Sequence, residues 1–435
     1  MTLWLDVDDL FFYARHSSRP SGIQRLSCET YIAMMQIAPS EVKFVIYDPK
    51  AATFRVVEWE DVARIYASIR SGRPASAEPG IAVDTLPPQN AIASFFRKLT
   101  GSPAPPPLKS HAPFVDLVDQ AQPGDILCAL GAPWHHAAYA EFLTKILSRT
   151  KMRFALLVHD LIPLLCPEFF EAGRAPHFEK VLLETLPLAD TLMTNSRSTA
   201  RDVLRWAADK GLSLKATPQA IPIGTGFSRP PPGVLPAGLE HRGYVLFVST
   251  IEIRKNHLQA FRVWCRMLRE MPRDQVPTLV FAGNLGWMVS DLMKAIENTN
   301  YLDGKLMLVK GPDDATLSAL YQGCLFTLFP SYYEGLGLPV SDSLSFGKLC
   351  VSSNRTSMPE VGGDYCLYVD PDNNDDAYGV VRRIIETPSQ ITSLENRIKA
   401  DFRPILWTDT ARAVLAAVAS TNATSDALTS ADKIP

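Results

Sequence analysis

The chain of 435 residues is 46% hydrophobic and 20% charged, which is typical of a globular protein, and its length predicts two or three domains. Its net charge of −3 argues against binding to nucleic acid through bulk electrostatic attraction. Seven single cysteines without a CxxC pair argue against a disulfide framework or a structural zinc site and favour a reducing compartment. We expect neither a signal peptide nor a membrane span, because no apolar run approaches about 20 residues.

Apolar strands alternate with amphipathic helices along most of the chain. A first series of expected strands comprises residues 3–7, 43–47, 125–130, 154–160 and 191–196. A second series comprises residues 244–250, 278–283, 305–311, 324–331, 348–353 and 365–370. This alternation predicts an α/β protein with two doubly wound, mainly parallel sheets, each covered by helices on both faces. In such sheets, ligands bind beyond the carboxyl ends of the strands.

A segment rich in proline and glycine, residues 228–243, separates the two series and predicts a linker. The expected domains are therefore an N-terminal domain over residues 1–227 and a C-terminal domain over residues 244–400. Residues 401–418 predict a helix that packs back toward the N-terminal domain, and the small, polar tail 419–435 is expected to be disordered.

The proline-rich residues 71–114 interrupt the rhythm of the first domain and predict a surface insertion. Within it, the stretch IASFFRKL at residues 92–99 combines basic and apolar side chains. Such a stretch can contact a membrane surface or an acceptor, or it can form a local helix that packs on the domain, which is the commoner case.

The ends of the first-domain strands carry several candidate site residues. Gly22 precedes a helix expected from Ile23 to about residue 38, where a glycine lets a phosphate approach the helix start. His159 ends a strand and can donate a hydrogen bond to a substrate, or it packs or caps a helix. Ser196 is a good N-cap for a helix over residues 197–209, and a functional role for the end of this strand is equally compatible.

In the second domain, Arg254 and Lys255 follow the strand at residues 244–250, directly before a helical stretch. Arginine offers a planar fork and lysine a point charge, so the pair is suited to clamp a diphosphate. The alternative is a solvated basic helix start, although cations there oppose the helix dipole.

The most specific stretch is FPSYYEGLGLPVSDSLSFGKLCV, residues 329–351. Two glycines in its turn let backbone amides approach a ligand, and Pro339 predicts the start of a helix over residues 339–346, whose N-terminus favours an anion. Glu334 in this turn is suited to accept hydrogen bonds from sugar hydroxyls, and Asp342 from a second diol. Alternatively, Glu334 caps the helix and Asp342 complements its dipole.

Metal-binding patterns are weak. Residues 6–8 match D-x-D, residues 370–376 lack the glycine and the final glutamate of a calcium loop, and the sequence has no HExxH. We therefore expect no metal and no cofactor. The side chains of Arg254 and Lys255 and the helix N-termini would supply the positive charge instead. A dehydrogenase is disfavoured because no GxGxxG follows the first strand.

Several segments, in their order along the chain, resemble the retaining GT-B glycosyltransferases of family GT4. They are SGIQR, VHDLIP, TNSRSTARD, STIEIRKNH, VFAG and the long stretch from FPSYYEG to YCLYVDP. The resemblance covers both domains and implies two Rossmann-like domains facing across a cleft. It further implies a metal-independent hexosyltransferase, with mannose and GDP as the favoured sugar and nucleotide. The acceptor would be a growing or lipid-linked glycan of bacterial surface polysaccharide, and the protein would be cytoplasmic, with lipid-linked acceptors placing it at the inner membrane face.

The resemblance also implies residue roles. Glu334 and Asp342 match the family's E-x7-E positions and would face the donor sugar and the ribose, respectively. Arg254 and Lys255 would hold the diphosphate, and His159 would lie beside the donor sugar near the reacting centre. Of these residues, the implied catalytic set is His159, Glu334, Arg254 and Lys255.

Other positions complete the site that the resemblance implies. The remaining donor-binding residues are Gly22, Gly311, Pro312, Gly335, Leu336, Gly337 and Leu338, and residues expected at the acceptor or behind the donor are Arg25, Asp160 and Asn195. Two departures stand out: Asp342 replaces the usual glutamate, and Ser249 replaces a common glycine. They keep open a non-catalytic nucleotide-sugar-binding partner of a polysaccharide-synthesis complex. A sugar-nucleotide epimerase of the same fold also remains as an alternative.

Overall fold

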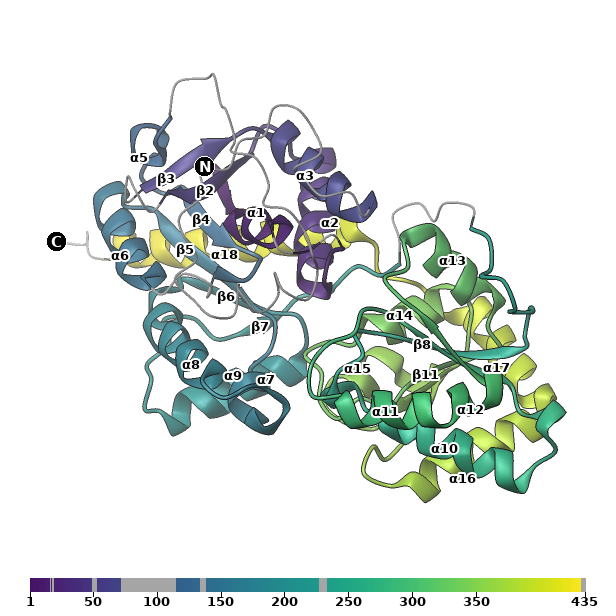
Figure 1. Cartoon of the computed structure of the whole chain (residues 1–435). Coiled ribbons are helices and arrows are strands. Elements are labelled where there is room, and N and C mark those ends of the chain that lie inside the picture. The colour runs from purple at the N-terminus through teal and green to yellow at the C-terminus, as the bar shows by residue number, and fades with distance from the viewer. Residues whose placement is uncertain are drawn as a thin grey trace.

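The computed structural model describes the main chain of residues 1–15, 17, 19–48, 53–71, 115–133, 138–226 and 233–431, and the side chains of these residues except 71 and 421–431. Within these residues the chain forms two sheets of mainly parallel strands, each with helices around it (Figure 1). The predicted α/β class with two doubly wound sheets is therefore confirmed. Most of the predicted insertion, residues 72–114, and the start of the predicted linker, residues 228–232, lie outside the described residues.

The N-terminal sheet has seven strands in the order β3-β2-β1-β4-β5-β6-β7. They are β1 (Leu3–Asp6), β2 (Val42–Asp48), β3 (Thr53–Val57), β4 (Ile126–Ala129), β5 (Arg153–Val158), β6 (Thr191–Thr194) and β7 (Gln219–Ala220). All neighbours are parallel except β2 and β3, and Leu5 of β1 lies opposite both Phe44 and Cys128. The chain reverses its direction of winding between β1 and β4, so the carboxyl ends of these strands mark a position where ligands commonly bind.

Alternating residues of these strands fill two separate cores, because successive side chains point to opposite faces of a sheet. Leu3 and Leu5 join one core, whereas Trp4 joins the other. The helices of this unit are α1 (Asp8–Ala14), α2 (Gly22–Ile37), α3 (Trp59–Ser71), α5 (Leu117–Gln120), α6 (Tyr139–Thr150), α7 (Ile162–Leu165), α8 (Arg174–Thr185) and α9 (Arg197–Asp209). Buried residues of α1, α2 and α3 line the first core, and those of α6, α8 and α9 line the second.

The C-terminal sheet has six parallel strands in the order β10-β9-β8-β11-β12-β13. They are β8 (Tyr244–Val248), β9 (Thr278–Ala282), β10 (Leu306–Val309), β11 (Thr327–Phe329), β12 (Cys350–Ser353) and β13 (Cys366–Val369). The helices are α10 (His257–Glu270), α11 (Ser290–Asn298), α12 (Asn300–Gly304), α13 (Asp314–Gly323), α14 (Leu338–Ser345), α15 (Met358–Gly362), α16 (Asn374–Glu386) and α17 (Pro388–Asp401). Here the winding reverses between β8 and β11, which brings the segments that follow these two strands together.

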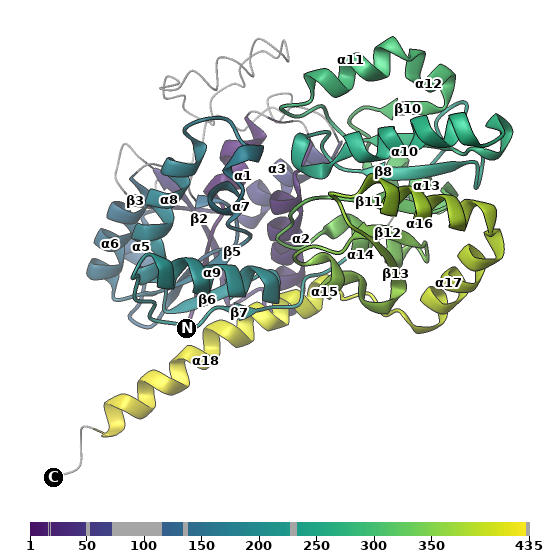
Figure 2. The ribbon, with the colours of Figure 1, turned by 90° about the horizontal axis from the view of Figure 1, so that it is seen from below.

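The last helix, α18 (Trp407–Ala431), leaves the C-terminal unit and packs on the N-terminal one (Figures 1 and 2). Its Trp407, Val414 and Val418 join the core that contains Leu5. The sequence predicts that this helix ends near residue 418 and is followed by a disordered tail, but the helix continues to Ala431. No glycine or proline interrupts residues 407–431, so nothing local ends the helix earlier.

Some elements differ from the sequence-based expectation. The edge strand β3 was not predicted; it pairs antiparallel with β2 and interrupts the parallel rhythm. Most predicted strands extend too far at their carboxyl ends: β5 ends at Val158 and β6 at Thr194, so the polar residues His159 and Asn195 already lie outside the sheet. Among the described helices, none combines the length and apolar character needed to cross a bilayer.

The packing of α18 can be tested at Gly224. The Gly224 amide donates to Thr410 Oγ1 over 2.8 Å, and a Cβ atom at this position would overlap the Trp407 indole. We expect Gly224→Ala to lower the free energy of unfolding by about 1–3 kcal/mol, the usual cost of overpacking. Urea denaturation measures this change.

The control is Gly379→Ala in α16, where an added Cβ meets nothing within 4 Å. Alanine is the better helix former by about 1 kcal/mol, so this variant should be slightly more stable than the wild type. Equal stability of Gly224→Ala and the wild type would contradict the described packing of α18 against Gly224.

Candidate active site

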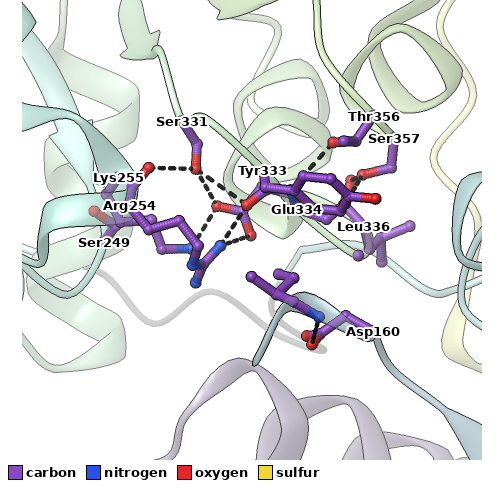
Figure 3. Close-up of polar contacts among 12 residues, drawn as sticks. Asp160, Ser249, Arg254, Lys255, Ser331, Tyr333, Glu334, Leu336, Thr356 and Ser357 are labelled. Atoms are coloured by element: carbon purple, nitrogen blue, oxygen red, sulfur yellow. Dashed lines mark hydrogen bonds and ion pairs between the residues drawn. The ribbon is translucent and has the colours of Figure 1, made fainter. Parts of the chain in front are cut away.

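The turns that follow β8 and β11 meet at the junction of the two units (Figure 3). The first turn carries Arg254 and Lys255 in a short 3-10 helix, Ile253–Lys255. The second carries Glu334 in the glycine-rich stretch before α14. The ends of β5 and β6, with Asp160 and Ser196, face these turns from the N-terminal unit. The structure thus brings together most of the predicted site residues.

A compact group of charges forms the centre of this site. Glu334 binds both cations: its Oε1 lies 2.6 Å from Lys255 Nζ, and its Oε2 lies 2.9 Å from Arg254 Nη1. Ser331 Oγ donates to Oε1 over 2.6 Å, and Arg254 Nη2 also binds Glu252 Oε1 over 2.7 Å. Glu334 is only 7% exposed, so two positive charges and two carboxylates are held together largely away from water.

The protonation of this group follows from its surroundings. Burial alone would raise the pKa of Glu334, but the charges of Arg254 and Lys255, with hydrogen bonds from Lys255 and Ser331, lower it to about 2. Glu334 is therefore ionised at neutral pH. Burial raises the pKa of Asp160 on the opposite domain, and the charge of Arg254 opposes that shift.

Two residues that the sequence analysis missed hold the turn in place. Thr356 Oγ1 accepts from the Glu334 amide over 3.1 Å, and Ser357 Oγ donates to the carbonyls of Glu334 and Leu336 over 3.0 and 2.9 Å. Both follow β12, the strand next to β11, so their position at a strand end was the available signal. Gly337 has a φ of 94°, a left-handed conformation that glycine adopts without strain.

Two helix starts from different units lie close together beside the charged group. Helix α2 begins at Gly22, and a Cβ atom there would lie 3.7 Å from Leu338 Cδ1, at the first residue of α14. Pro339 is the second residue of α14 and not the first, as predicted, because the helix begins at Leu338. Helix N-termini carry partial positive charge and unsatisfied N–H groups, so this junction favours an anion.

His159 is buried, and its Nε2 donates to the Leu130 carbonyl over 2.9 Å. Burial lowers its pKa to about 4, so the imidazole is neutral at pH 7. The expected hydrogen bond from this nitrogen to a substrate is thus directed to the main chain in this structure. The His159 carbonyl lies against Gly335, where any Cβ atom would overlap it.

Ser196 is the N-cap that the sequence predicts, and it also contacts the other unit. Its Oγ accepts from the Thr199 amide over 3.0 Å as the N-cap of α9, and it also donates to the Gly335 carbonyl over 2.5 Å. Thr199 Oγ1 lies 3.2 Å from the same carbonyl and 3.1 Å from Asn195 Oδ1. Asn195 and the Gly335 carbonyl are therefore alternative acceptors for the Thr199 hydroxyl.

Asp342 lies away from Glu334, although the resemblance pairs them. It is 6% exposed, and its Oδ1 accepts from the Gly226 amide over 2.8 Å. Its Oδ2 lies 3.9 Å from Arg25 Nη1, and Arg25 also pairs with Asp314 over 3.0 Å. Burial raises the pKa of Asp342, opposed by the charge of Arg25. The carboxylate expected at the ribose thus binds the segment that connects the two units.

The remaining predicted donor residues occupy two places. Gly311 and Pro312 follow β10, two strands from β8, and Gly311 donates its amide to the Gly283 carbonyl over 3.4 Å. Leu336 and Leu338 pack their side chains against the N-terminal core around Leu5. Ser249, the second departure from the family pattern, donates its hydroxyl to the Thr250 carbonyl over 3.0 Å. In the described part of the chain, no group of three or more metal-ligating side chains is arranged to hold a metal ion.

Comparison with solved structures defines the fold class. HepE (Alr3699) of Anabaena, solved with UDP and glucose, superposes with a TM-score of 0.61 at 12% identity, covering 97% of this chain and 100% of that chain. Sucrose-phosphate synthase of Thermosynechococcus elongatus gives a TM-score of 0.59 at 15% identity, covering 99% of this chain and 100% of the other. The chain therefore has the GT-B fold, as the resemblance implied.

Residues 238–401 match the family described as Glycosyl transferases group 1. The chain is 31% identical over 223 residues to O-antigen chain mannosyltransferase B of Escherichia coli, which is 50% of this chain and 57% of that protein. It is 29% identical over 234 residues to the serotype-specific mannosyltransferase WbdA of Escherichia coli, which is 50% of this chain and 28% of that protein. The matches thus span little more than half of the first relative and less than a third of the second.

The charge group at Glu334 has a measurable signature in stability. Replacing Glu334 by glutamine leaves two buried cations without their shared carboxylate, and we expect this to cost about 3 kcal/mol of unfolding free energy at pH 7. Because the pKa of Glu334 falls to about 2 on folding, its contribution is complete above its unfolded pKa of about 4.3 and is lost as pH falls toward 2. Denaturation of both proteins from pH 7 to pH 3 measures the difference.

The matched control is Glu386→Gln, which removes a carboxylate that pairs with Arg382 over 2.8 Å on an exposed helix face. Its effect should stay below about 0.5 kcal/mol. A Glu334→Gln protein as stable as the wild type at pH 7, or a difference that does not shrink below pH 4, would contradict the described ion pairs.

Proposed function

We propose that this protein is a retaining, metal-independent glycosyltransferase. It moves a hexose, with mannose favoured, from a nucleoside diphosphate sugar, with GDP favoured, to a growing or lipid-linked glycan in bacterial surface polysaccharide synthesis. The observation that carries the proposal is the buried group of Arg254, Lys255 and Glu334 beside two converging helix starts. Similarity to proteins named as O-antigen mannosyltransferases supports the choice of sugar and pathway class.

The site suits a diphosphate for electrostatic reasons. Glu334 pairs with both Arg254 and Lys255 in this structure, and Glu252 also pairs with Arg254. A diphosphate carries more negative charge than one carboxylate, so it would compete with Glu334 for these cations. Released from them, the Glu334 carboxylate would accept hydrogen bonds from hydroxyls of the donor sugar. Glu334 would then respond to both halves of the donor, because the diphosphate displaces it from the cations and the sugar hydroxyls bind to it.

The transfer step needs charge stabilisation more than a protein base. The bond between the anomeric carbon and the diphosphate oxygen breaks, and the acceptor oxygen forms a new bond on the same face. The acceptor proton passes to the leaving diphosphate. Arg254, Lys255 and the helix starts stabilise the charge that develops on this group, a contribution that is usually large in enzymes.

The state of the nearby side chains agrees with this assignment. Glu334 has a low pKa and is engaged by two cations, and His159 Nε2 is occupied by the Leu130 carbonyl. Neither is available as a strong base in this arrangement. We assign His159 to positioning of the His159–Asp160 segment beside Gly335, with the donor sugar on the side of Asp160.

The acceptor would enter from the N-terminal unit, whose strand ends face the donor turn. A lipid-linked acceptor would place the protein at the inner face of the cytoplasmic membrane, with the protein itself cytoplasmic. Neither a metal nor a further cofactor is required by the proposed chemistry, because the two cations and the helix starts supply the positive charge.

One observation favours a second candidate, a nucleotide-sugar-binding protein without transferase activity. Asp342, which the family resemblance assigns to the ribose, accepts from the Gly226 amide instead. Without its ribose contact, a donor would bind without being aligned for transfer, as expected of a nucleotide-sugar-binding protein.

The proposal is tested by release of nucleoside diphosphate from GDP-, UDP- and dTDP-sugars in the presence of lipid-linked glycan extracts and a chelator. We expect saturable release from one donor, and a loss of about 100-fold in kcat/KM for Lys255→Ala, the usual effect of removing one group that stabilises developing charge. The matched control is Lys145→Ala, which removes an exposed lysine that pairs with Glu141 on α6.

The outcomes separate the candidates. Donor binding without release in any extract would support the non-catalytic alternative. Equal activity of the Lys255→Ala and Lys145→Ala proteins would contradict the assigned site, and the absence of binding to every nucleotide sugar would contradict both candidates.

A further inference from the structure

Asp314, the first residue of α13, binds two arginines of the opposite unit. Its Oδ1 lies 3.0 Å from Arg25 Nη2 on α2, and its Oδ2 lies 2.9 Å from Arg70 Nη2 and 3.0 Å from Arg70 Nε on α3. Both carboxylate oxygens are therefore used, and each contacts a different helix. Figure 1 shows α13 on the side of the C-terminal unit that faces α2 and α3.

The surroundings strengthen these contacts. Arg70 also lies 3.7 Å from Glu29 Oε1, which accepts a hydrogen bond from Tyr66 over 3.1 Å. The side chains of Arg25 and Asp314 are each 16% exposed, and that of Arg70 is 30% exposed. Fully exposed ion pairs contribute little, but a partly shielded network with bidentate geometry contributes more.

The position of Arg25 connects this network to the candidate active site. It lies one turn after Gly22, the residue of α2 that approaches Leu338 at the start of α14. Its other nitrogen, Nη1, lies 3.9 Å from Asp342 on α14 itself. Arg25 therefore joins the first turn of α2 to both α13 and α14 of the C-terminal unit.

Other contacts join the two units at a different place. Glu360 on α15 accepts from the amides of Arg197 and Ser198 at the start of α9, over 2.8 and 3.2 Å. Tyr333 donates to Asp202 of α9 over 2.6 Å. These contacts involve α9, whereas Asp314 binds α2 and α3. The ion pairs that join α2 to the C-terminal unit are therefore those of Arg25 with Asp314 and Asp342, beside the apolar contacts of Leu336 and Leu338.

We propose that Asp314 is a positioning residue: by holding Arg25 and Arg70, it fixes the arrangement in which the start of α2 meets the start of α14. Loss of this carboxylate loosens the α2 side of the junction while Arg254, Lys255 and Glu334 keep their places in the C-terminal unit. Where catalysis is concerned, this inference rests on the proposed transferase function; the conformational part does not.

The test is charge reversal and its rescue. Asp314→Arg places a cation against Arg25 and Arg70, and Arg70→Glu places an acid against Asp314 and Glu29. We expect each single variant to increase the radius of gyration in small-angle X-ray scattering at low salt and to increase amide exchange in the first turn of α2. The double variant Asp314→Arg/Arg70→Glu, which restores an ion pair across the junction, should return both values toward the wild type.

The matched control is Asp291→Arg, the same charge reversal in the first turn of α11, at an exposed position of the same unit. It should leave scattering and exchange unchanged. Asp314→Asn provides a milder variant, with a smaller opening in the same direction, should the reversal prevent folding.

Kinetics supply a second and separable result. If the proposed function holds, Asp314→Arg should lower kcat for transfer at least tenfold, change the Kd for nucleoside diphosphate less than threefold, and regain activity in the double variant. If no donor is turned over by the wild type, the proposed function fails while scattering and exchange still decide the role of Asp314. Unchanged scattering and exchange in both Asp314→Arg and Asp314→Asn, or opening that the double variant does not reverse, would overturn the inference.

Discussion

The arrangement of this protein depends on burying Arg254 and Lys255 against Glu334 at the junction of its two sheets. Shielded charges are costly unless a counter-charge is close, and Glu334 pairs with both cations while Glu252 also pairs with Arg254. Arg254 and Lys255 meet Glu334 because β8 and β11 are neighbours at the point where the sheet reverses its winding. The topology therefore creates the site, and the ion pairs fix the turn that carries Glu334.

The turn that carries Glu334 also contacts the N-terminal unit. Gly335 presents its carbonyl to Ser196 and Thr199 and accepts the close approach of His159 because it lacks a Cβ atom. Around it, the contacts between units are mostly ion pairs, hydrogen bonds and aromatic contacts such as Phe169 with Tyr332. Interfaces of this kind between domains commonly allow relative motion, which suits a site that must admit and release a substrate.

Most of the fold and the position of the candidate site could be predicted from the sequence. Strands and helices follow from local periodicity, and the topology of the sheet places the polar residues at strand ends. Lys255 and Glu334 are 79 residues apart, yet both follow strands of one sheet, and that is sufficient to predict their proximity. The edge strand β3 escaped prediction because its pairing is antiparallel in an otherwise parallel rhythm.

The directions of individual side chains could not be predicted from the sequence in the same way. Asp342 turns to the Gly226 amide and His159 to the Leu130 carbonyl, and each partner is a main-chain group with no signature in the sequence. Thr356 and Ser357 follow β12, and that position at a strand end was the only signal for them, because their hydrogen bonds go to the backbone of another turn.

The proposed diphosphate site consists of Arg254 and Lys255, which Glu334 occupies in the free protein. Calorimetric titration of GDP and UDP into the wild type, Lys255→Ala and Glu334→Gln tests it most directly. The account predicts binding of one nucleotide to the wild type, at least tenfold weaker binding to Lys255→Ala, and several-fold tighter binding to Glu334→Gln, because the phosphates no longer compete with the carboxylate. Equal affinity of all three proteins, or weaker binding to Glu334→Gln once its folding is verified, would contradict the account.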